Sequence, residues 1–236
     1  MSQAARIAVL ALKEVEKHIK IGATGIELDK VATEVVRSHG AEASFHTVEN
    51  YQYSICVTDN DKVVHGLPTK EPLQNGDIVG IDIGALYKGF HSDLAQTYVV
   101  GKVDKEVEGF LTTGELALKK AIAAAQAGNH VGDISQAIQE TIEGAGYSVV
   151  KELVGHGVGR KLHEEPLIPG IGEAGGGAVL EEGMVIAIEI IYNQGKPEVV
   201  LLPDGWSIAT KDGSLAGLFE RTIAITKKGP VVLTQL

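Results

Sequence analysis

The sequence predicts an α+β fold, with an antiparallel β-sheet covered by helices and a chain divided into two similar halves. Two observations lead to this prediction. In each half, candidate helices are followed by a run of strand-like segments, which is typical of α+β proteins. A short helical segment of the first half also recurs in the second half after a shift of 106 residues. We therefore expect one domain over residues 1–236, with pseudo-repeat halves at about 1–105 and 106–236.

The repeated segment is IELDKVATEVVRSHG in the first half and GDISQAIQETIEGAG in the second. Both place apolar residues at helical spacing, and Gly40 coincides with Gly146 after the shift. These glycines suit the left-handed conformation that often ends a helix. Each helix also begins with a residue pair typical of a capping box, Thr24 with Glu27 and Asp133 with Gln136.

Longer helices are expected before the repeated ones, at about residues 3–20 and 105–127. Strand-like segments follow in both halves. The first half contains YSICVT, DIVGIDIGAL and HSDLAQTYVV, and the second contains MVIAIEIIYN, EVVLL and RTIAITK. Helices followed by antiparallel strands, twice over, predict an approximate internal two-fold axis.

The composition excludes several classes of function. The net charge of −10 argues against nonspecific binding to nucleic acid or to an anionic membrane. No apolar run is long enough to span a bilayer, and the N-terminal segment resembles an amphipathic helix rather than a signal peptide. The single cysteine, Cys56, excludes an internal disulfide, so the cytoplasm is the expected compartment.

Two aspartates stand in segments that look buried. Asp82 lies in IVGIDI, where every neighbouring side chain is apolar or absent. A buried carboxylate without a partner is very costly, so it is normally paired, protonated or bound to a metal. A turn at Tyr87-Lys88-Gly89 would place Asp93 nearly opposite Asp82 on one face of a hairpin. Two facing carboxylates repel each other unless a positive charge lies between them.

Acids in apolar strands recur in the second half. Glu189 lies in MVIAIEII, 107 residues after Asp82, and Glu220 precedes RTIAI. His156 is the candidate imidazole ligand, because its flanking glycines leave the ring accessible. Taken singly, each acid could be a solvent-facing residue and His156 a loop residue. The joint pattern favours two divalent metal ions with shared bridging oxygens, and a mixed carboxylate and imidazole set suits Mn, Fe, Co or Zn.

Three longer motifs extend this pattern. They are NDKVVHGLP at residues 60–68, GHGVGR continuing to HEEP at residues 163–166, and the segment from Trp206 to Glu220. Together they resemble the motifs of type I methionine aminopeptidases, and the resemblance runs from about residue 4 to about residue 228. It implies a single catalytic domain with the pita-bread fold, whose pseudo-two-fold symmetric halves enclose two metal ions. The metal ligands that it implies are Asp82, Asp93, His156, Glu189 and Glu220.

The resemblance implies a cytoplasmic hydrolase that removes the N-terminal methionine from peptides and nascent proteins. A water bridging the two metal ions would attack the peptide bond, with Glu189 as the general base. His163 would stabilise the oxyanion, and His65 would hydrogen-bond the scissile amide region. The implied partners are peptide N-termini and the ribosome, with no direct binding of nucleic acid or membrane. We expect a monomer.

The resemblance also implies a pocket for the methionine side chain. Its expected residues are Cys56, Tyr51, Phe45, Leu162 and Trp206, with His65 and His163 also contacting substrate. Leu162 stands where an aromatic residue is expected. Arg221 follows Glu220 where a histidine is usual, and strand alternation predicts that it points away from the metals.

Other functions fit the sequence less well. An Xaa-Pro dipeptidase or aminopeptidase of the same fold is expected to carry an extra N-terminal domain and a different motif around His65. A type II methionine aminopeptidase should carry an insertion in the second half, and a metal-free binding protein of this fold should have lost ligands. A dinucleotide-dependent oxidoreductase rests only on GIGEAG at residues 170–175, which follows no convincing strand pattern and runs into more glycines rather than a helix. That segment is predicted to be a loop.

Overall fold

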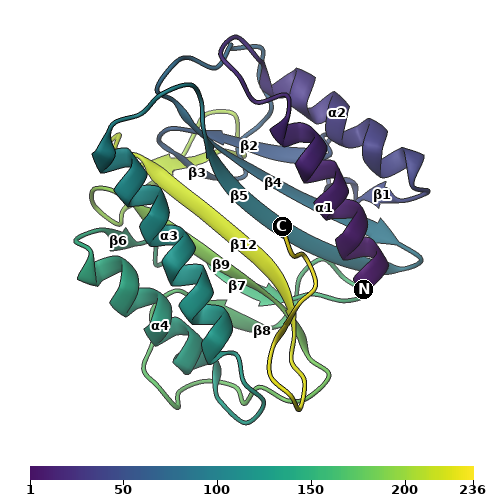
Figure 1. Cartoon of the computed structure of the whole chain (residues 1–236), viewed down its shortest axis with the longest axis vertical. Helices are drawn as coiled ribbons and strands as arrows, with labels where there is room; N and C mark the ends of the chain where they lie inside the picture. Colours follow the sequence, from purple (N-terminus) through teal and green to yellow (C-terminus); the bar gives the residue numbers. More distant parts are fainter.

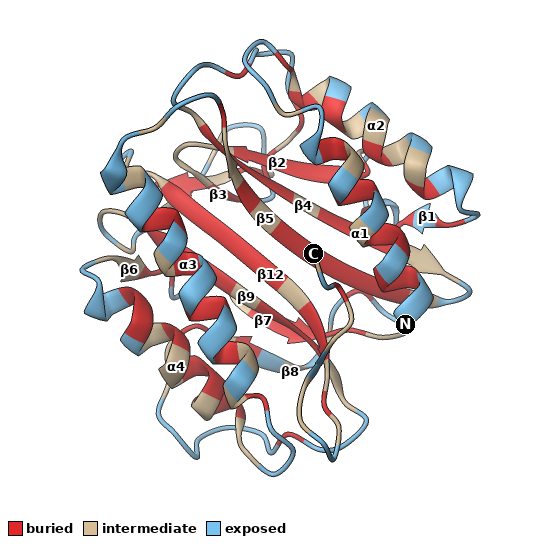
Figure 2. Ribbon diagram, viewed as in Figure 1, coloured by how far each residue is buried: buried red, intermediate tan, exposed pale blue.

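Four helices lie on one face of a large antiparallel sheet in the computed structural model, which describes residues 1–236 (Figure 1). They form two pairs: α1 (Ser2–Glu16) packs against α2 (Gly25–Ser38), and α3 (Lys105–Ala124) packs against α4 (Val131–Gly144). The helix surfaces that meet the sheet are buried, and the opposite surfaces are exposed (Figure 2). The predicted α+β class, with an antiparallel sheet covered by helices, is therefore confirmed.

Ten strands form this sheet. They are β1 (Glu42–Ala43), β2 (Ile55–Asp59), β4 (Ile78–Tyr87), β5 (Phe90–Val99), β6 (Ser148–Val149), β7 (Val154–Gly157), β8 (Glu164–Pro169), β9 (Val185–Asn193), β12 (Ala216–Ala224) and β13 (Val231–Val232). The main order is β1-β4-β5-β12-β9-β7-β8, while β2 pairs with β4, β6 with β9 and β13 with β12. A smaller sheet contains β10 (Val199–Leu201), β11 (Ile208–Thr210) and β3 (Lys62–Val64), and a 3-10 helix, η1, covers Ser44–Thr47.

The two halves of the chain meet between β5 and β12 at the centre of the sheet. On one side β5 pairs with β4, and on the other β12 pairs with β9, so that each half contributes an antiparallel strand pair and a helix pair (Figure 1). The first residue of α2, Gly25, and the first of α4, Val131, are separated by the 106-residue shift, and so are their last residues, Ser38 and Gly144. The predicted pseudo-two-fold repeat is therefore present in the fold.

Helix caps fix where the repeated helices begin. Thr24 accepts a hydrogen bond from the N–H of Glu27, and the Glu27 carboxylate accepts one from the N–H of Thr24 at 2.9 Å, so the first capping box is confirmed. The second prediction was wrong by three residues. The N-cap of α4 is His130, whose N–H donates to the carboxylate of Asp133 at 2.7 Å. Asp133 therefore lies in the first turn, where its charge also complements the helix dipole.

A tight turn sets the register of the β4–β5 hairpin. Lys88 and Gly89 form the turn with φ angles of 51° and 76°, the double left-handed conformation of a type I′ turn. This register places Asp82 opposite Ala95, two residues along β5 from Asp93. The two aspartates share a face, as predicted, but they lie diagonally rather than opposite each other. The hairpin is centred between Lys88 and Gly89, one residue beyond the midpoint of the two aspartates.

The hydrophobic core lies between the helices and the sheet and is divided like the repeat. One cluster of buried side chains, which includes Phe110 and Ile188, packs α3 and α4 against β9 and β12. The other, which includes Ile81 and Ile83, packs α1 and α2 against β2 and β4. Because neighbouring strand residues face opposite sides, Asp82 between these two isoleucines must project from the face that the helices leave free. No helix combines the length and apolar character needed to cross a membrane.

Candidate metal centre

A row of acids crosses four neighbouring strands on the sheet face opposite the helices. Asp82 on β4 pairs with Ala95 on β5, Ala95 pairs with Glu220 on β12, and Glu220 pairs with Glu189 on β9. Directly opposed residues of an antiparallel sheet project from the same face. Three carboxylates therefore point into one space, and the small side chain of Ala95 lies between them.

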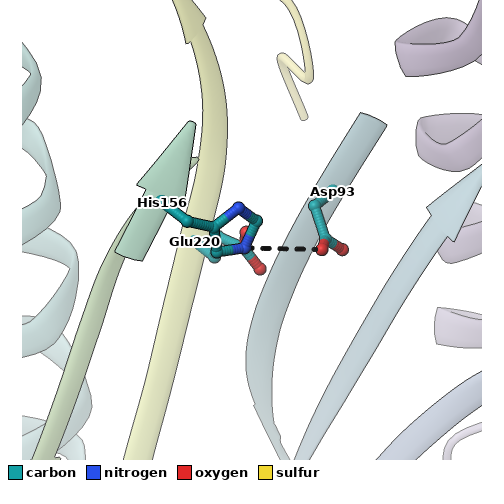
Figure 3. Close-up of side chains that lie close together, drawn as sticks. All are labelled: Asp93, His156 and Glu220. Atoms are coloured by element: carbon teal, nitrogen blue, oxygen red, sulfur yellow. Dashed lines mark ion pairs between the residues drawn. The ribbon is translucent and has the colours of Figure 1, made fainter. Parts of the chain in front are cut away.

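Asp93 and His156 complete the cluster. Asp93 lies on the same face of β5, and His156 on β7 pairs with Ala187, two residues from Glu189. The imidazole Nε2 of His156 lies 3.5 Å from Oε1 of Glu189 and 4.0 Å from Oδ2 of Asp93. In Figure 3, His156, Asp93 and Glu220 point toward one another from three different strands. The structure thus brings all five predicted metal ligands together.

Asp93 and Glu220 are buried, Asp82 and Glu189 are partly buried, and none of the four has a lysine or arginine as an ion-pair partner. One oxygen of Asp82, one of Asp93 and one of Glu220 have no hydrogen-bond partner. Burial raises the pKa of Asp93 to about 7 and that of Glu189 to about 8, and it raises the pKa values of Asp82 and Glu220 well above their usual range. Repulsion from neighbouring carboxylates adds to this shift in Asp82, Glu189 and Glu220.

His156 is prepared to act as a neutral ligand. Its Nδ1 lies 2.9 Å from the carbonyl oxygen of Gly157, which can only accept, so Nδ1 carries the proton and the lone pair of Nε2 faces the acids. Burial lowers the pKa of His156 to about 4. The flanking glycines are required by close packing. A Cβ on Gly155 would meet the carbonyl oxygen of Ala187, and one on Gly157 would meet that of Glu165.

These residues fit a divalent cation. Single ligand atoms of Asp93, His156 and Glu220 lie within 4.8 Å of one another. Unpartnered buried carboxylate oxygens are costly in the free protein, and a bound cation would satisfy them. The mixture of carboxylates and one imidazole suits borderline transition metals rather than Mg²⁺ or Ca²⁺ alone. The arrangement can therefore bind divalent metal, with Asp82 and Glu189 adjoining the three clustered side chains.

Two more histidines border the cleft that contains the acids, a cavity of about 130 Å³. His163 packs edge-on against His156, with ring centroids 4.4 Å apart. Desolvation in the cleft lowers the pKa of His163, so the ring is neutral at neutral pH. His65 follows β3 and adopts a left-handed φ of 56°, a conformation that is uncommon for a residue with a side chain. Both predicted histidines thus lie beside the acids, on loops rather than strands.

The rest of the cleft is apolar. The five residues predicted for the side-chain pocket all line it: Phe45, Tyr51, Cys56, Leu162 and Trp206. The rings of Tyr51 and Trp206 meet edge to face at 5.0 Å, and the Tyr51 hydroxyl donates to Cys56 Sγ at 3.2 Å. Cys56 pairs with Asp82 across β2 and β4, so the apolar wall directly adjoins the acids. Burial raises the pKa of its thiol, which stays protonated.

One lining residue, Val48, was not predicted. It follows Phe45 by three residues at the end of η1, and side chains at that spacing eclipse each other in a 3-10 helix. Two other residues lie outside the cleft. Arg221 faces a groove on the helix side of the sheet. His91 shares the strand face of Asp93, but its Nδ1 contacts the Ser44 hydroxyl at 3.0 Å and it does not line the cavity.

The chain matches known proteins over nearly its whole length. The model of metallopeptidase family M24 matches residues 1–227. The methionine aminopeptidase of Clostridium perfringens is 42% identical over 234 residues, which cover 99% of this chain and 94% of the relative. Methionine aminopeptidase 1 of Bacillus subtilis is 43% identical over 236 residues, which cover 100% of this chain and 95% of the relative.

Solved structures agree with these sequence similarities. The crystal structure of a methionine aminopeptidase from Thermotoga maritima superposes with a TM-score of 0.98 at 41% identity, covering 100% of this chain and 95% of that one. A prolidase from Pyrococcus furiosus superposes with a TM-score of 0.79 at 26% identity, covering 100% of this chain and 62% of that one. The fold is common to both, and the agreement is higher with the Thermotoga structure.

Proposed function

The chain belongs to metallopeptidase family M24, and on that premise we propose that its cleft removes the N-terminal methionine from peptides and nascent proteins by hydrolysis. The expected pita-bread fold is confirmed by the solved structures that it matches. The observation that supports this function most strongly is a set of buried, unpaired carboxylates beside an apolar pocket. The acids suit a hydrolytic metal centre, and the pocket suits an unbranched apolar side chain.

The chain binds divalent metal, and we propose two ions, each a Mn, Fe, Co or Zn ion. The residues that would hold them are Asp82, Asp93, His156, Glu189 and Glu220. Such ions lower the pKa of a coordinated water and polarise the carbonyl group of the substrate. Five side chains exceed the needs of one tetrahedral ion, which supports the count of two.

The chain's own residues supply the proton transfers. Glu189 would accept the proton of the attacking water and deliver it to the leaving amine, since its carboxylate faces the cleft from the middle of β9. His163, neutral and next to His156, would donate a hydrogen bond to the developing oxyanion. His65, which also lines the cleft, would donate to the scissile amide.

Two adjoining walls of the cleft would bind different parts of the substrate. Phe45, Tyr51, Cys56, Leu162 and Trp206 would bind the methionine side chain. The adjoining metal centre would bind the free amine of a chain end, a lone-pair donor that an internal peptide bond lacks. This arrangement favours cleavage at N-termini.

One chain supplies all the acids and the whole apolar wall, and we propose that the enzyme acts as a monomer. We also propose that it meets nascent chains at the ribosome in the cytoplasm, where its one buried cysteine remains a thiol. Light scattering on the purified protein checks the first point, since a dimer mass would contradict it.

A peptidase assay with two substrates tests the proposed function. Metal-loaded protein is incubated with Met-Gly-Ser and, separately, with an Xaa-Pro peptide, because prolidases share this fold. Release of free methionine from the first peptide only is expected. Cleavage of the Xaa-Pro peptide alone would reject the methionine assignment, and cleavage of neither would reject aminopeptidase activity.

A further inference from the structure

The central seam of the sheet, between β5 and β12, is joined differently from the strand pairs on either side. β4 and β5 are aligned over ten residue pairs and β9 and β12 over nine. β5 and β12 are aligned over only two, Ala95 with Glu220 and Leu94 with Arg221. The seam also separates Asp93 from Glu220, two acids of the cluster that come from opposite halves of the chain. The contacts that close the seam therefore set the spacing of these two acids.

Two threonine hydroxyls bridge the seam where the aligned pairs stop. Thr222 on β12 donates from Oγ1 to the carbonyl oxygen of Asp93 at 2.6 Å and accepts the N–H of Asp93 at 2.9 Å. Thr97 on β5 makes the same two bonds with Leu218 on β12, at 2.8 and 3.0 Å. Each threonine lies two residues beyond the Ala95–Glu220 pair on its own strand. The two bridges are thus equivalent under the internal repeat.

Thr222 is itself held by the C-terminal segment. Its N–H donates to the hydroxyl of Thr234 at 2.9 Å, and its carbonyl accepts the N–H of Leu233 at 2.9 Å. Thr222 and Thr234 are both fully buried. Since every polar group of Thr222 has a partner, its hydroxyl is fixed toward Asp93.

The equivalent bridges have unequal consequences. Thr97 fixes Leu218, whose side chain is apolar, whereas Thr222 fixes Asp93, whose carboxylate faces His156 and Glu220 (Figure 3). One oxygen of the Asp93 carboxylate has no hydrogen-bond partner, so its direction depends on where the backbone of β5 lies. Outer-shell groups that orient a ligating side chain typically change metal affinity about 10- to 100-fold when they are removed, and a lock on the ligand's backbone acts on the same orientation.

We propose that Thr222 is a positioning residue of the metal centre, which acts by locking the backbone of Asp93 through its hydroxyl. This inference rests on the proposed role of Asp93 as a metal ligand. The Thr222 hydroxyl takes the place of backbone-to-backbone hydrogen bonds between β5 and β12 at Asp93, the proposed ligand. The C-terminal segment then contributes to the metal centre through Thr234, although none of its residues lines the cleft.

Three variants test the proposal. Thr222→Val removes the hydroxyl at nearly constant shape, and Thr222→Ser keeps the hydroxyl. Thr97→Val is the matched control, because it removes the equivalent hydroxyl from the other bridge. Each metal-free protein is titrated with CoCl₂ by calorimetry, and the visible absorption of bound Co²⁺ reports the ligand geometry. Thermal melts without metal measure the loss of stability, which should be similar for the two valine variants.

We expect Thr222→Val to bind Co²⁺ about 10- to 100-fold more weakly than the wild type, with an altered absorption spectrum. Thr97→Val and Thr222→Ser should retain the affinity and spectrum of the wild type. Equal affinities of Thr222→Val and Thr97→Val would overturn the proposal, because the hydroxyl would then contribute only to stability. A wild-type protein that binds no Co²⁺ would instead reject the metal centre itself.

A fourth variant, Thr234→Val, covers the case in which Thr222→Val does not fold. Thr234→Val removes the acceptor for the N–H of Thr222 and leaves the hydroxyl of Thr222 in place. It should weaken Co²⁺ binding relative to Thr97→Val. Affinities that do not differ between these two variants would contradict the proposed link.

Discussion

Glu189 and Glu220 lie directly opposite each other on β9 and β12, and no lysine or arginine pairs with either. Glu220 is only 2% exposed, and the side chain of Glu189 is 14% exposed. Like charges directly opposite in a sheet destabilise it. The pair is therefore compatible with the fold when it is protonated or when a cation lies between the carboxylates. Metal binding and folding stability should accordingly be linked in this protein.

The stability of the metal-free protein should fall as the pH rises from 6.5 to 8. In the folded chain the pKa of Asp93 is about 7 and that of Glu189 about 8, whereas both acids ionise near pH 4 when unfolded. The folded state thus holds more protons in this interval, so its free energy of unfolding decreases with pH. His156, with a pKa lowered to about 4, and His65 and His163, whose pKa values are also lowered, act in the opposite direction, but mainly below pH 7, so they offset only part of this fall.

Thermal melts of chelator-treated protein at pH 6.5 and pH 8 measure this effect. The Tm should be lower at pH 8, and saturating Mn²⁺ or Co²⁺ should raise it there. Glu189→Gln should reduce the difference between the two pH values, because it removes one of the titrating groups. A Tm that is equal or higher at pH 8 in the metal-free wild type would show that the acids are not held protonated by burial.

Glu189→Gln should abolish most of the catalytic rate. If Glu189 is the general base, kcat should fall by about 10²- to 10⁴-fold at saturating metal. Glu181→Gln, which neutralises an exposed acid just before β9, is the control and should leave kcat unchanged. Methionine release from a Met-Gly peptide gives both rates. A kcat for Glu189→Gln within a few fold of the wild type would remove Glu189 from the proton transfer.

Leu162→Ala should impair recognition of methionine without affecting the metal. Leu162 is buried in the apolar wall, and shortening it would remove contacts with the methionine side chain that this wall is proposed to bind. We expect kcat/KM for a Met peptide to fall at least about 10-fold and the free energy of unfolding to fall by about 2–5 kcal/mol. Leu116→Ala, at an exposed position on α3, should change neither. An unchanged kcat/KM in Leu162→Ala would place the methionine side chain elsewhere.

Gly157→Ala should weaken metal binding through His156. The added Cβ would meet the carbonyl oxygen of Glu165 on β8, so β7 and its histidine must shift. Gly144→Ala has open space around it on α4 and should be neutral or stabilising by up to about 1 kcal/mol. Calorimetric titration with Co²⁺ compares the two variants. Equal affinities would mean that β7 accommodates the methyl group without moving its ligand.

The features that could be predicted from sequence depend on local patterns. The repeated helices have the expected shift, and both are followed by glycines with left-handed φ angles, 68° at Gly40 and 88° at Gly146. The acids that stand between isoleucines could also be found from a local pattern, because each one interrupts an apolar run in its own segment. Strand alternation alone sends Asp82 away from the core that Ile81 occupies.

Boundaries and registers were less predictable because distant partners decide them. The first helix ends at Glu16 rather than near residue 20, and the third at Ala124 rather than near 127. β12 begins at Ala216, five residues before the predicted segment, since residues 216–220 pair with β9. Pairing of this kind is invisible in a strand's own sequence.

The residues that could not be found from the sequence also depend on contacts with distant parts of the chain. Val48 reaches the cleft because η1, which it follows, packs against β4 and β5, and its own residue type is ordinary for a core position. Thr222 stands next to the recognised Glu220 and Arg221, but a threonine in a strand is common. Its bonds to Asp93 depend on the junction of two halves of the chain, 129 residues apart.

Metal reconstitution of the metal-free enzyme tests whether methionine release depends on a bound divalent metal. Chelator-treated protein is titrated with CoCl₂ while methionine release from a Met-Gly peptide is followed. We expect no release before metal is added, and a rise that saturates once no more than two ions are bound per chain. Undiminished release from protein shown to contain no metal would contradict this expectation.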